Sequence, residues 1–505
     1  MKIRFLAAFL CFLLVGIIPT PVRAEDNLAK DISGSEIVTD SSGFPSMKAL
    51  FDGKLLSGKA ASEDAFLTLE YEDGIGSLYF LFDAACGSYV ITDNSSGKSM
   101  TAGEHGFIHE FVDLVAVFGN ACKSVTVTFP NGARIFELFV YTPGEVSETV
   151  QKWQVPADGS TDLVLFSTHC DDEQLFFAGV LPYYAGELGY QVQVVYLTDH
   201  REDDPRRVHE MLNGLWAVGV TAYPVAASYP DFILKHDMAG TYATFEAMGY
   251  PREELLGYVV ENLRRFKPMV AVGHDINGEY GHGMHMVYAD LLMEAVTITH
   301  DPTRYPESAE KYGLWDTPKT YLHLYEDNEI IMDWDRPLES FNGMTAFEVT
   351  QKLGYPCHVS QYQDFAWYHY AAKSAKDVVK YNPCYYGLYR STVEADVQKN
   401  DFFEHIITHA EQARIEAERL AAEEEARRME EERLAEEKRL AEEEARRQEE
   451  AAKAAAEQAR LEEAARLAEE AARKRQQFIA LICFAIILIF MAILIIIRIK
   501  SSKKS

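Results

Sequence analysis

The chain has 505 residues, which is too long for one ordinary hydrophobic core, so two or three modules are expected. Its formal net charge is −30, with 48 Lys and Arg against 78 Asp and Glu. Because phosphate binding requires clustered Lys and Arg, this balance argues against nucleic acid as a partner.

The N-terminus carries a targeting signal. A basic start, an apolar core and the small residues Val22 and Ala24 at the −3 and −1 positions predict a secretory signal peptide over residues 1–24, cleaved after Ala24. A signal anchor is the rival interpretation, but the apolar core is short for a membrane span.

Residues 25–150 show short alternating runs divided by turn residues, including AFLTLEY, SYVITD and SVTVTFP. This spacing is typical of an antiparallel β-sandwich. With ALFDGK early, SLYFLFD in the middle and RIFELFVYTPG last, the region resembles the discoidin-like, galactose-binding-like domains. The resemblance implies glycan binding, while a structural spacer is an equally open interpretation.

The sequence pattern is different over residues 155–405. The apolar runs DLVLFS, VQVVYLT, AYPVAA, MVAVGH and TYLHLYE alternate with expected helices over 173–189, 203–218, 252–266 and 284–297. Such alternation predicts an α/β, Rossmann-like domain with a mostly parallel sheet covered on both faces. Ligands of such sheets bind beyond the carboxyl ends of the strands.

Residues 406–476 are rich in Ala, Glu and Arg, with opposite charges three and four apart that support a helix. A coiled coil would need apolar residues at regular heptad positions, and Leu420, Leu434 and Leu440 are too sparse. A long, charged helical stalk is therefore favoured over a coiled coil, with self-association left open. At 1.5 Å per residue it would reach roughly 100 Å.

The last segment predicts a membrane anchor. Phe478 to Ile497 is an uninterrupted apolar run, so residues 477–498 are expected to form one transmembrane helix. Arg498 and Lys500 begin a basic cytoplasmic tail, residues 499–505. The chain is thus expected to be a single-pass protein of the cell membrane with its globular part outside the cell.

Cysteines are few in the predicted extracellular part, which keeps Cys86, Cys122, Cys170, Cys357 and Cys384. An odd number leaves at least one unpaired. Cys86 with Cys122 and Cys357 with Cys384 are candidate bridges, but the sequence does not fix the pairing.

The stretch STHCDDE directly follows the apolar run DLVLF. A strand end would fix His169, and Asp172 can turn back toward the same point. Zinc accepts imidazole and carboxylate ligands, and a catalytic site needs three of them. Asp171 would then be free to take a proton from water. A helix N-terminus also favours acidic residues, but this explains neither His169 nor a second cluster.

The second cluster is GHDINGEYGHGMH, which follows another predicted strand. His282 and His285 are three residues apart at the start of a helix and share one face. Two histidine clusters at strand ends of one α/β domain favour a metal site over structural histidines. The thiol of Cys170 is not expected to be a ligand, because adjacent His169 and Cys170 point in different directions.

Together, THCDDE and GEYGHGMH resemble the PIG-L/LmbE-like family of zinc-dependent N-deacetylases over roughly 160–400. That family carries a His-Pro-Asp-Asp-Glu motif after its first strand and a Gly-His-x-x-His motif further on. Further matches are Arg207 and Glu210 in an Arg-x-x-Glu helix, and His358, Ser360 and Gln361 in a late His-x-Ser-Gln segment.

The resemblance implies His169, Asp172 and His285 as ligands of Zn²⁺, with Fe²⁺ as an alternative metal. It implies Asp171 as the general base that deprotonates a zinc-bound water. His282 would stabilise the oxyanion or protonate the leaving amine, and Arg207 would contact the substrate. The products would be acetate and a free amino sugar.

Two positions depart from the family pattern. Cys170 replaces the proline of the first motif, and Met284 replaces the residue, often Asp, that precedes the last ligand. Loss of the proline could loosen the turn between ligand and base. Loss of the acidic residue could remove a partner that orients a histidine. Neither change deletes a ligand, so a working enzyme is expected.

The sequence therefore predicts a membrane-anchored, extracellular zinc hydrolase that removes the N-acetyl group of GlcNAc-type glycans. The alternative is a stalked surface adhesin or glycan-binding protein whose deacetylase-like domain is inactive. Metal content and product release would separate the two.

Overall fold

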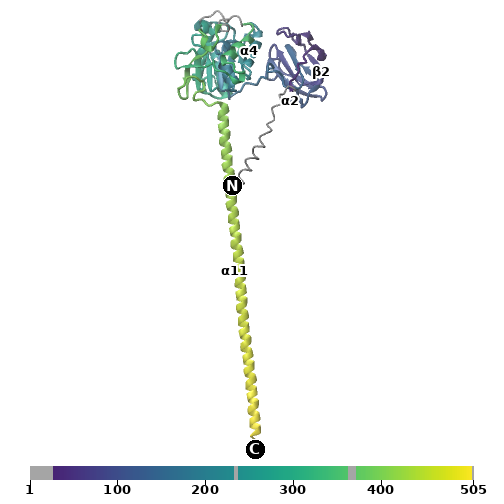
Figure 1. Ribbon diagram of the computed structural model, residues 1–505, viewed down its shortest axis with the longest axis vertical. Coiled ribbons are helices and arrows are strands. Elements are labelled where there is room, and N and C mark those ends of the chain that lie inside the picture. The colour runs from purple at the N-terminus through teal and green to yellow at the C-terminus, as the bar shows by residue number, and fades with distance from the viewer. Residues whose placement is uncertain (1–26, 232–236, 362–370, 503–505) are drawn as a thin grey trace, which may run out of the picture. The chain divides into compact units, whose positions relative to one another are not determined.

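The computed structural model describes residues 27–231, 237–361 and 371–502. The chain divides into two compact units, one up to Gln412 and one from Ala413 onward (Figure 1). The predicted signal peptide, residues 1–24, lies outside the described residues.

The N-terminal region forms two antiparallel sheets, with strand orders β1-β2-β7-β4-β5 and β6-β3-β8. Their strands are β1 (Val38–Ser42), β2 (Phe66–Ile75), β3 (Ser77–Phe82), β4 (Tyr89–Asp93), β5 (Lys98–Ala102), β6 (His109–Asp113), β7 (Cys122–Thr128) and β8 (Ile135–Tyr141), with the short helix α2 (Leu114–Phe118). Phe80 of β3 contacts Tyr89 of β4 edge to face, with ring centroids 5.5 Å apart, so the two sheets share a core. The discoidin-like assignment stays a prediction.

A seven-stranded sheet follows, in the order β11-β10-β9-β12-β13-β15-β14. Its strands are β9 (Leu163–Ser167), β10 (Val192–Tyr196), β11 (Val225–Ala226), β12 (Val270–Gly273), β13 (Lys319–His323), β14 (Glu329–Ile331) and β15 (Tyr385–Ser391). The strands β9 to β13 coincide with the five predicted apolar runs and pair in parallel. The antiparallel strands β14 and β15, which extend one edge, were not predicted.

Helices of this region are α3 (Asp172–Leu175), α4 (Arg206–Ala217), α5 (Met238–Ala247), α6 (Arg252–Phe266), α7 (Gly283–Ile298), α8 (Pro306–Tyr312) and α9 (Ala346–Val349). The expectation of one helix over 173–189 is wrong. Gly179 adopts a φ of 92°, and helix resumes only at Val180, which leads into the π-helical turn η4 (Pro182–Glu187). Proline suits a helix start because it lacks the N–H that a helix interior needs.

Both faces of the seven-stranded sheet are covered, as alternate residues of β9 show. Leu165 belongs to the same buried cluster as Leu215 of α4, whereas Phe166 belongs to a second cluster with Leu263 of α6. Because β9 and β12 pair in parallel, with Val164 opposite Ala271, the loops that follow them leave the sheet at the same edge.

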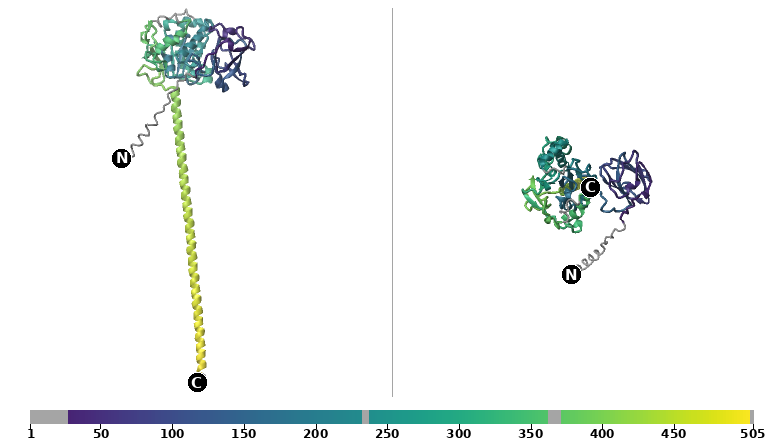
Figure 2. Two further views of the ribbon diagram at one scale, coloured as in Figure 1. Left: turned by 45° about the vertical axis from the view of Figure 1, so that its right-hand side comes forward. Right: turned by 90° about the horizontal axis from the view of Figure 1, so that it is seen from above.

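The second unit is helical. The helix α11 (His409–Ser501) runs without a break through the predicted stalk and the predicted span (Figure 2). Its charges pair along the helix, as Arg414 does with Glu418 at 2.8 Å, and its described side chains from residue 412 onward are exposed. One stretch of α11 is long and apolar enough to cross a membrane.

Candidate metal centre

The loops after β9 and β12 bring the two histidine clusters together. His169 lies just beyond β9, and His274 is the first residue after β12. The second loop passes through a 3-10 turn to His282, the residue before α7, and to His285 in the first turn of that helix. All four imidazoles are buried, so bulk water does not screen their charges.

The three predicted ligands, His169, Asp172 and His285, form a tight triangle. His169 Nδ1 lies 2.9 Å from Asp172 Oδ2 and 3.0 Å from His285 Nε2. The distance from His285 Nε2 to the same carboxylate oxygen is 3.1 Å. The backbone N–H of His169 also donates to Asp172 Oδ2 at 2.8 Å, which fixes the carboxylate. Three atoms with lone pairs therefore face one another, an arrangement that a cation stabilises.

The electrostatics of the triangle favour positive charge. Burial lowers the pKa of His169, but the carboxylates of Asp172 and Asp231 raise it to about 10. Burial likewise lowers the pKa of His285, and Asp172 and Glu279 raise it to about 9. Burial raises the pKa of Asp172, yet the two imidazoles hold it well below its usual range. Protons or a metal ion can supply the charge that this geometry demands.

Glu279, which the sequence analysis missed, orients one of these predicted ligands. Its Oε2 accepts hydrogen bonds from His274 Nδ1 and His285 Nδ1, each at 2.8 Å, and its Oε1 accepts one from His323 Nδ1 at 2.7 Å. Because His285 donates through Nδ1, its Nε2 is the nitrogen that faces Asp172. Metal-binding histidines in proteins are usually fixed by a carboxylate in this way. The only sequence signal was an acidic residue inside GEYGH.

Asp171, the predicted general base, lies beside the triangle without joining it. Its Oδ1 lies 3.3 Å from Arg207 Nη2 of α4. Burial raises the pKa of Asp171, and the Arg207 guanidinium opposes that shift. Arg207 also donates from Nη1 to His200 Nδ1 at 3.0 Å. These contacts of Arg207 are to protein groups, so its predicted contact with substrate stays a prediction.

His282 serves as the N-cap of α7, because its Nδ1 accepts a hydrogen bond from the backbone N–H of Met284 at 3.2 Å. A neutral imidazole that accepts at Nδ1 carries its hydrogen at Nε2. Burial and the nearby His169 and His285 lower the pKa of His282 to about 3, which keeps the ring neutral. Its ring centroid is 4.8 Å from that of His169. His282 can therefore donate a hydrogen bond next to the triangle.

Within the described ranges, three other combinations of side chains could hold a metal ion, with ligand atoms within 4.8 Å of one another. They are His169–His282–His285, His169–His200–Asp231 and Asp172–His274–His285. His274 donates to Glu279 and accepts from the Thr168 N–H at 2.9 Å, which uses both ring nitrogens. The cap on His282 opposes a ligand role there. The predicted triangle, whose edges are 2.9, 3.0 and 3.1 Å, therefore fits a metal better than the sets that contain His274 or His282.

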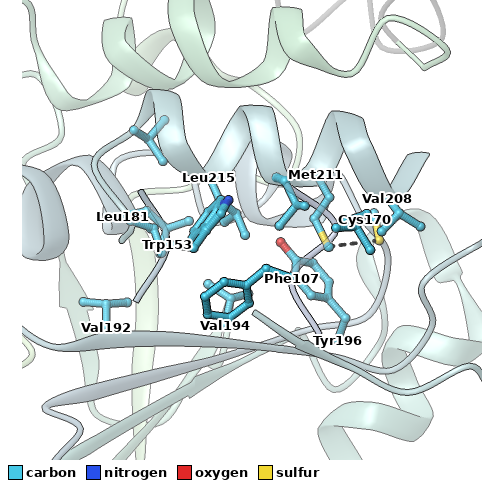
Figure 3. Close-up of a cluster of buried hydrophobic side chains, with 14 of the residues drawn as sticks. Phe107, Trp153, Cys170, Leu181, Val192, Val194, Tyr196, Val208, Met211 and Leu215 are labelled. Atoms are coloured by element: carbon cyan, nitrogen blue, oxygen red, sulfur yellow. Dashed lines mark hydrogen bonds between the residues drawn. The ribbon is translucent and has the colours of Figure 1, made fainter. Parts of the chain in front are cut away.

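The residues that depart from the family pattern both point into apolar core. Cys170 Sγ lies 3.4 Å from Met211 Sδ (Figure 3) and 3.5 Å from the Thr198 carbonyl oxygen. Met284 belongs to the buried cluster of α6 and α7. Met284 offers His285 no carboxylate to orient its ring, but the carboxylate of Glu279 does so.

The remaining motif residues pair with one another. Glu173 Oε1 lies 3.1 Å from His358 Nε2, and Glu210 accepts a hydrogen bond from the Ser360 hydroxyl at 2.6 Å. The backbone N–H of Gln361 donates to the carbonyl oxygen of His358 at 2.9 Å. The first two contacts tie the late segment to α3 and α4.

Comparison with known proteins finds one matching family and several similar deacetylases. Residues 164–296 match the family model described as PIG-L, GlcNAc-PI de-N-acetylase, so the α/β region contains a PIG-L family domain. A 1D-myo-inositol 2-acetamido-2-deoxy-alpha-D-glucopyranoside deacetylase 1 of Catenulispora acidiphila is 29% identical over 183 residues, which are 32% of this chain and 54% of that protein. The corresponding deacetylase of Streptomyces scabiei is 25% identical over 198 residues, 34% of this chain and 59% of its own.

The chain thus spans little more than half the length of these relatives. Among solved structures, the N,N'-diacetylchitobiose deacetylase from Pyrococcus horikoshii superposes with a TM-score of 0.29 at 14% identity, covering 45% of this chain and 83% of that one.

Proposed function

We propose that the α/β region is a metal-dependent N-deacetylase that hydrolyses the acetamide of GlcNAc-type sugars. The observation that carries the proposal is the buried triangle of His169, Asp172 and His285, with the carboxylate of Asp171 outside it. The family match over residues 164–296 supports the reaction class. The relatives' names supply the substrate class, a 2-acetamido sugar.

The donor set of the triangle fits a zinc-like ion. Tetrahedral zinc with Zn–N distances of about 2.0–2.1 Å places its ligand atoms about 3.3 Å apart. The edges of the triangle are 2.9, 3.0 and 3.1 Å. Three protein ligands leave a fourth position open, as in catalytic sites, and Fe²⁺ suits the same donors. The bound ion would supply a Lewis acid for the acetamide carbonyl oxygen.

The surrounding residues would carry the proton transfers. Asp171 would accept the proton that water loses as its oxygen attacks the carbonyl carbon. Arg207 would hold Asp171 in place, because the two side chains already face each other at 3.3 Å. The Nε2–H of the neutral His282 would donate a hydrogen bond to the developing oxyanion, and the proton held by Asp171 would pass to the leaving nitrogen. Breakage of the C–N bond would then yield acetate and a free amino sugar.

We also propose an anchored, extracellular arrangement. The signal peptide of residues 1–24 would deliver the globular unit outside the cell, and the apolar part of α11 would cross the membrane. Arg498 and Lys500, which follow the apolar run, favour a cytoplasmic end. The N-terminal region would bind glycan if the discoidin-like assignment holds.

Acetate release by the full chain in detergent, supplied with zinc, tests the function. The substrates are N-acetylglucosamine, N,N'-diacetylchitobiose and an inositol-linked N-acetylglucosamine. We expect release by the wild type and none by Asp171→Asn, which keeps the side-chain shape and the metal. Asp158→Asn, which removes an exposed carboxylate bound to Arg265, is the matched control.

Two other outcomes are informative. Bound metal without release from any substrate would favour the alternative, a surface protein that binds glycans without hydrolysing them. A wild-type chain that binds no metal would overturn the proposal.

A further inference from the structure

Helix α4 is buried on nearly every side, and each side contacts a different part of the molecule. Arg207 faces Asp171 of the candidate site, and Glu210 binds Ser360. Its apolar side packs onto the sheet through Val208, Met211 and Leu215 (Figure 3). The remaining side, formed by His209, Asn213 and Trp216, faces the N-terminal region.

That last contact is a chain of hydrogen bonds whose directions follow from the donors available. Trp153 Nε1 can only donate, and it lies 2.8 Å from Gln151 Oε1. His109 Nδ1, 2.7 Å from the same oxygen, must therefore donate as well. In a neutral His109 ring Nε2 keeps the lone pair, so it accepts a hydrogen bond from His209 Nδ1 at 2.8 Å. Gln151 Nε2 donates to Asn213 Oδ1, also on α4, at 2.7 Å.

With His109 neutral, this chain has one consistent arrangement of hydrogens. His109 is 2% exposed and His209 is 1% exposed, so ionising either would bury a charge. Burial lowers the pKa of His109 to about 4, in agreement with a neutral ring. Beside the chain, Phe107 of the N-terminal region stacks on Tyr223 with ring centroids 4.6 Å apart.

We propose that His109 is a positioning residue for the hydrolytic site. Through its hydrogen bond with His209 it fixes α4 in the position from which Arg207 can hold Asp171. The N-terminal region therefore contributes to catalysis in addition to any role in glycan binding. His209 lies two residues from Arg207 on one helix, so a displacement at His209 moves the guanidinium too. This inference rests on the function proposed above.

The reactivity of the Cys170 thiol, which lies next to the site, reports the position of α4 without any substrate. Cys170 Sγ lies 3.4 Å from Met211 Sδ, and Met211 is two residues after His209. Cys122 and Cys384 are also buried but lie in other elements, so their reactivity reports general unfolding. Alkylation of each thiol by iodoacetamide in the full chain can be read by peptide mass spectrometry.

The key variants are His209→Leu, which removes the donor, and His209→Asn, whose amide N–H can replace Nδ1–H. We expect His209→Leu to raise alkylation of Cys170 several-fold while Cys122 and Cys384 stay protected. Its kcat for acetate release should fall by about 10- to 100-fold with KM little changed, because a misplacement of about 1 Å can cost that much. His209→Asn should restore both readouts.

Tyr223→Phe is the matched control, because it removes the acceptor for the backbone N–H of Ile108 at the same interface but outside α4. It should leave kcat and thiol reactivity unchanged. Equal exposure of all three thiols in His209→Leu, or wild-type values of both readouts, would overturn the proposal. If alkylation follows the expected pattern but the wild type releases no acetate, the proposed function fails and the coupling to α4 stands.

Discussion

The candidate metal centre and helix α11 hold charged side chains in opposite surroundings. Glu279 is fully buried and accepts hydrogen bonds from three histidines. Arg419 of α11 bridges Glu416 and Glu423, and all three side chains are more than half exposed. Removing one partner from a buried group leaves a charge that water cannot reach, whereas water replaces an exposed partner at little cost. The energetic cost of removing one partner of a charged group in this chain therefore depends on whether that group is buried or exposed.

The largest effect is expected from Asp172→Asn, because this change removes the negative charge that both triangle histidines share. We expect the affinity for Zn²⁺ to fall by more than about 100-fold, beyond the range for loss of an outer partner. Competition with a chelator in the full chain measures this, with Asp158→Asn as the control. Wild-type affinity in Asp172→Asn would rule out its role as a ligand.

A smaller loss is expected from Glu279→Gln. Glutamine offers only one acceptor oxygen, so it cannot satisfy three histidines, and His285 would lose its fixed orientation. The affinity for Zn²⁺ should fall by about 10- to 100-fold, the usual effect of an outer carboxylate. The same chelator titration applies. An unchanged affinity would mean that packing alone orients His285.

Acid should weaken the fold through His109. Burial lowers its pKa in the folded state to about 4, below the ordinary value of 6.5, so the unfolded chain binds the proton more readily. Its contribution is present above pH 6.5 and is lost as the pH falls toward 4. By pH 5 the loss should be about 2 kcal/mol of the free energy of unfolding.

Urea unfolding at pH 7 and pH 5 measures this loss, and the His109→Gln variant isolates it. Glutamine keeps an oxygen that can accept from His209 but does not titrate. The variant should lose less stability on acidification than the wild type. An equal loss in both chains would assign the acid sensitivity to other groups.

The smallest effect is expected from Arg419→Ala in α11. Its ion pairs are exposed, so salt screens them and neighbouring pairs maintain the helix. Circular dichroism of a peptide spanning 413–476 should show a slight loss of helicity that disappears at high salt. A large loss would show that the charged helix depends on individual pairs, contrary to the comparison above.

Much of the parallel sheet could be predicted from the sequence because buried strands read as continuous apolar runs. All five predicted runs in residues 155–405 are strands, and the loops after DLVLFS and MVAVGH meet as their parallel pairing requires. The strand β15 escaped prediction, because its run YYGLYRS mixes apolar and polar residues and its partner β13 lies far back along the chain.

The triangle of His169, Asp172 and His285 could be located from the sequence because its members stand in two short motifs. Glu279 and His323 could not be recognised, since they contact each other across 44 residues and no spacing marks them. His109 and His209 lie 100 residues apart, and each alone is an ordinary histidine. The catalytic roles of Asp171 and His282 and the substrate contact of Arg207 stay predictions.

The central claim, that the triangle holds the metal, is tested most directly by anomalous X-ray scattering at the zinc edge from crystals of the zinc-loaded protein. We predict one strong peak in contact with His169 Nδ1, Asp172 Oδ2 and His285 Nε2. A peak on the opposite side of His169, between His200 and Asp231, or no peak near these residues would contradict the account.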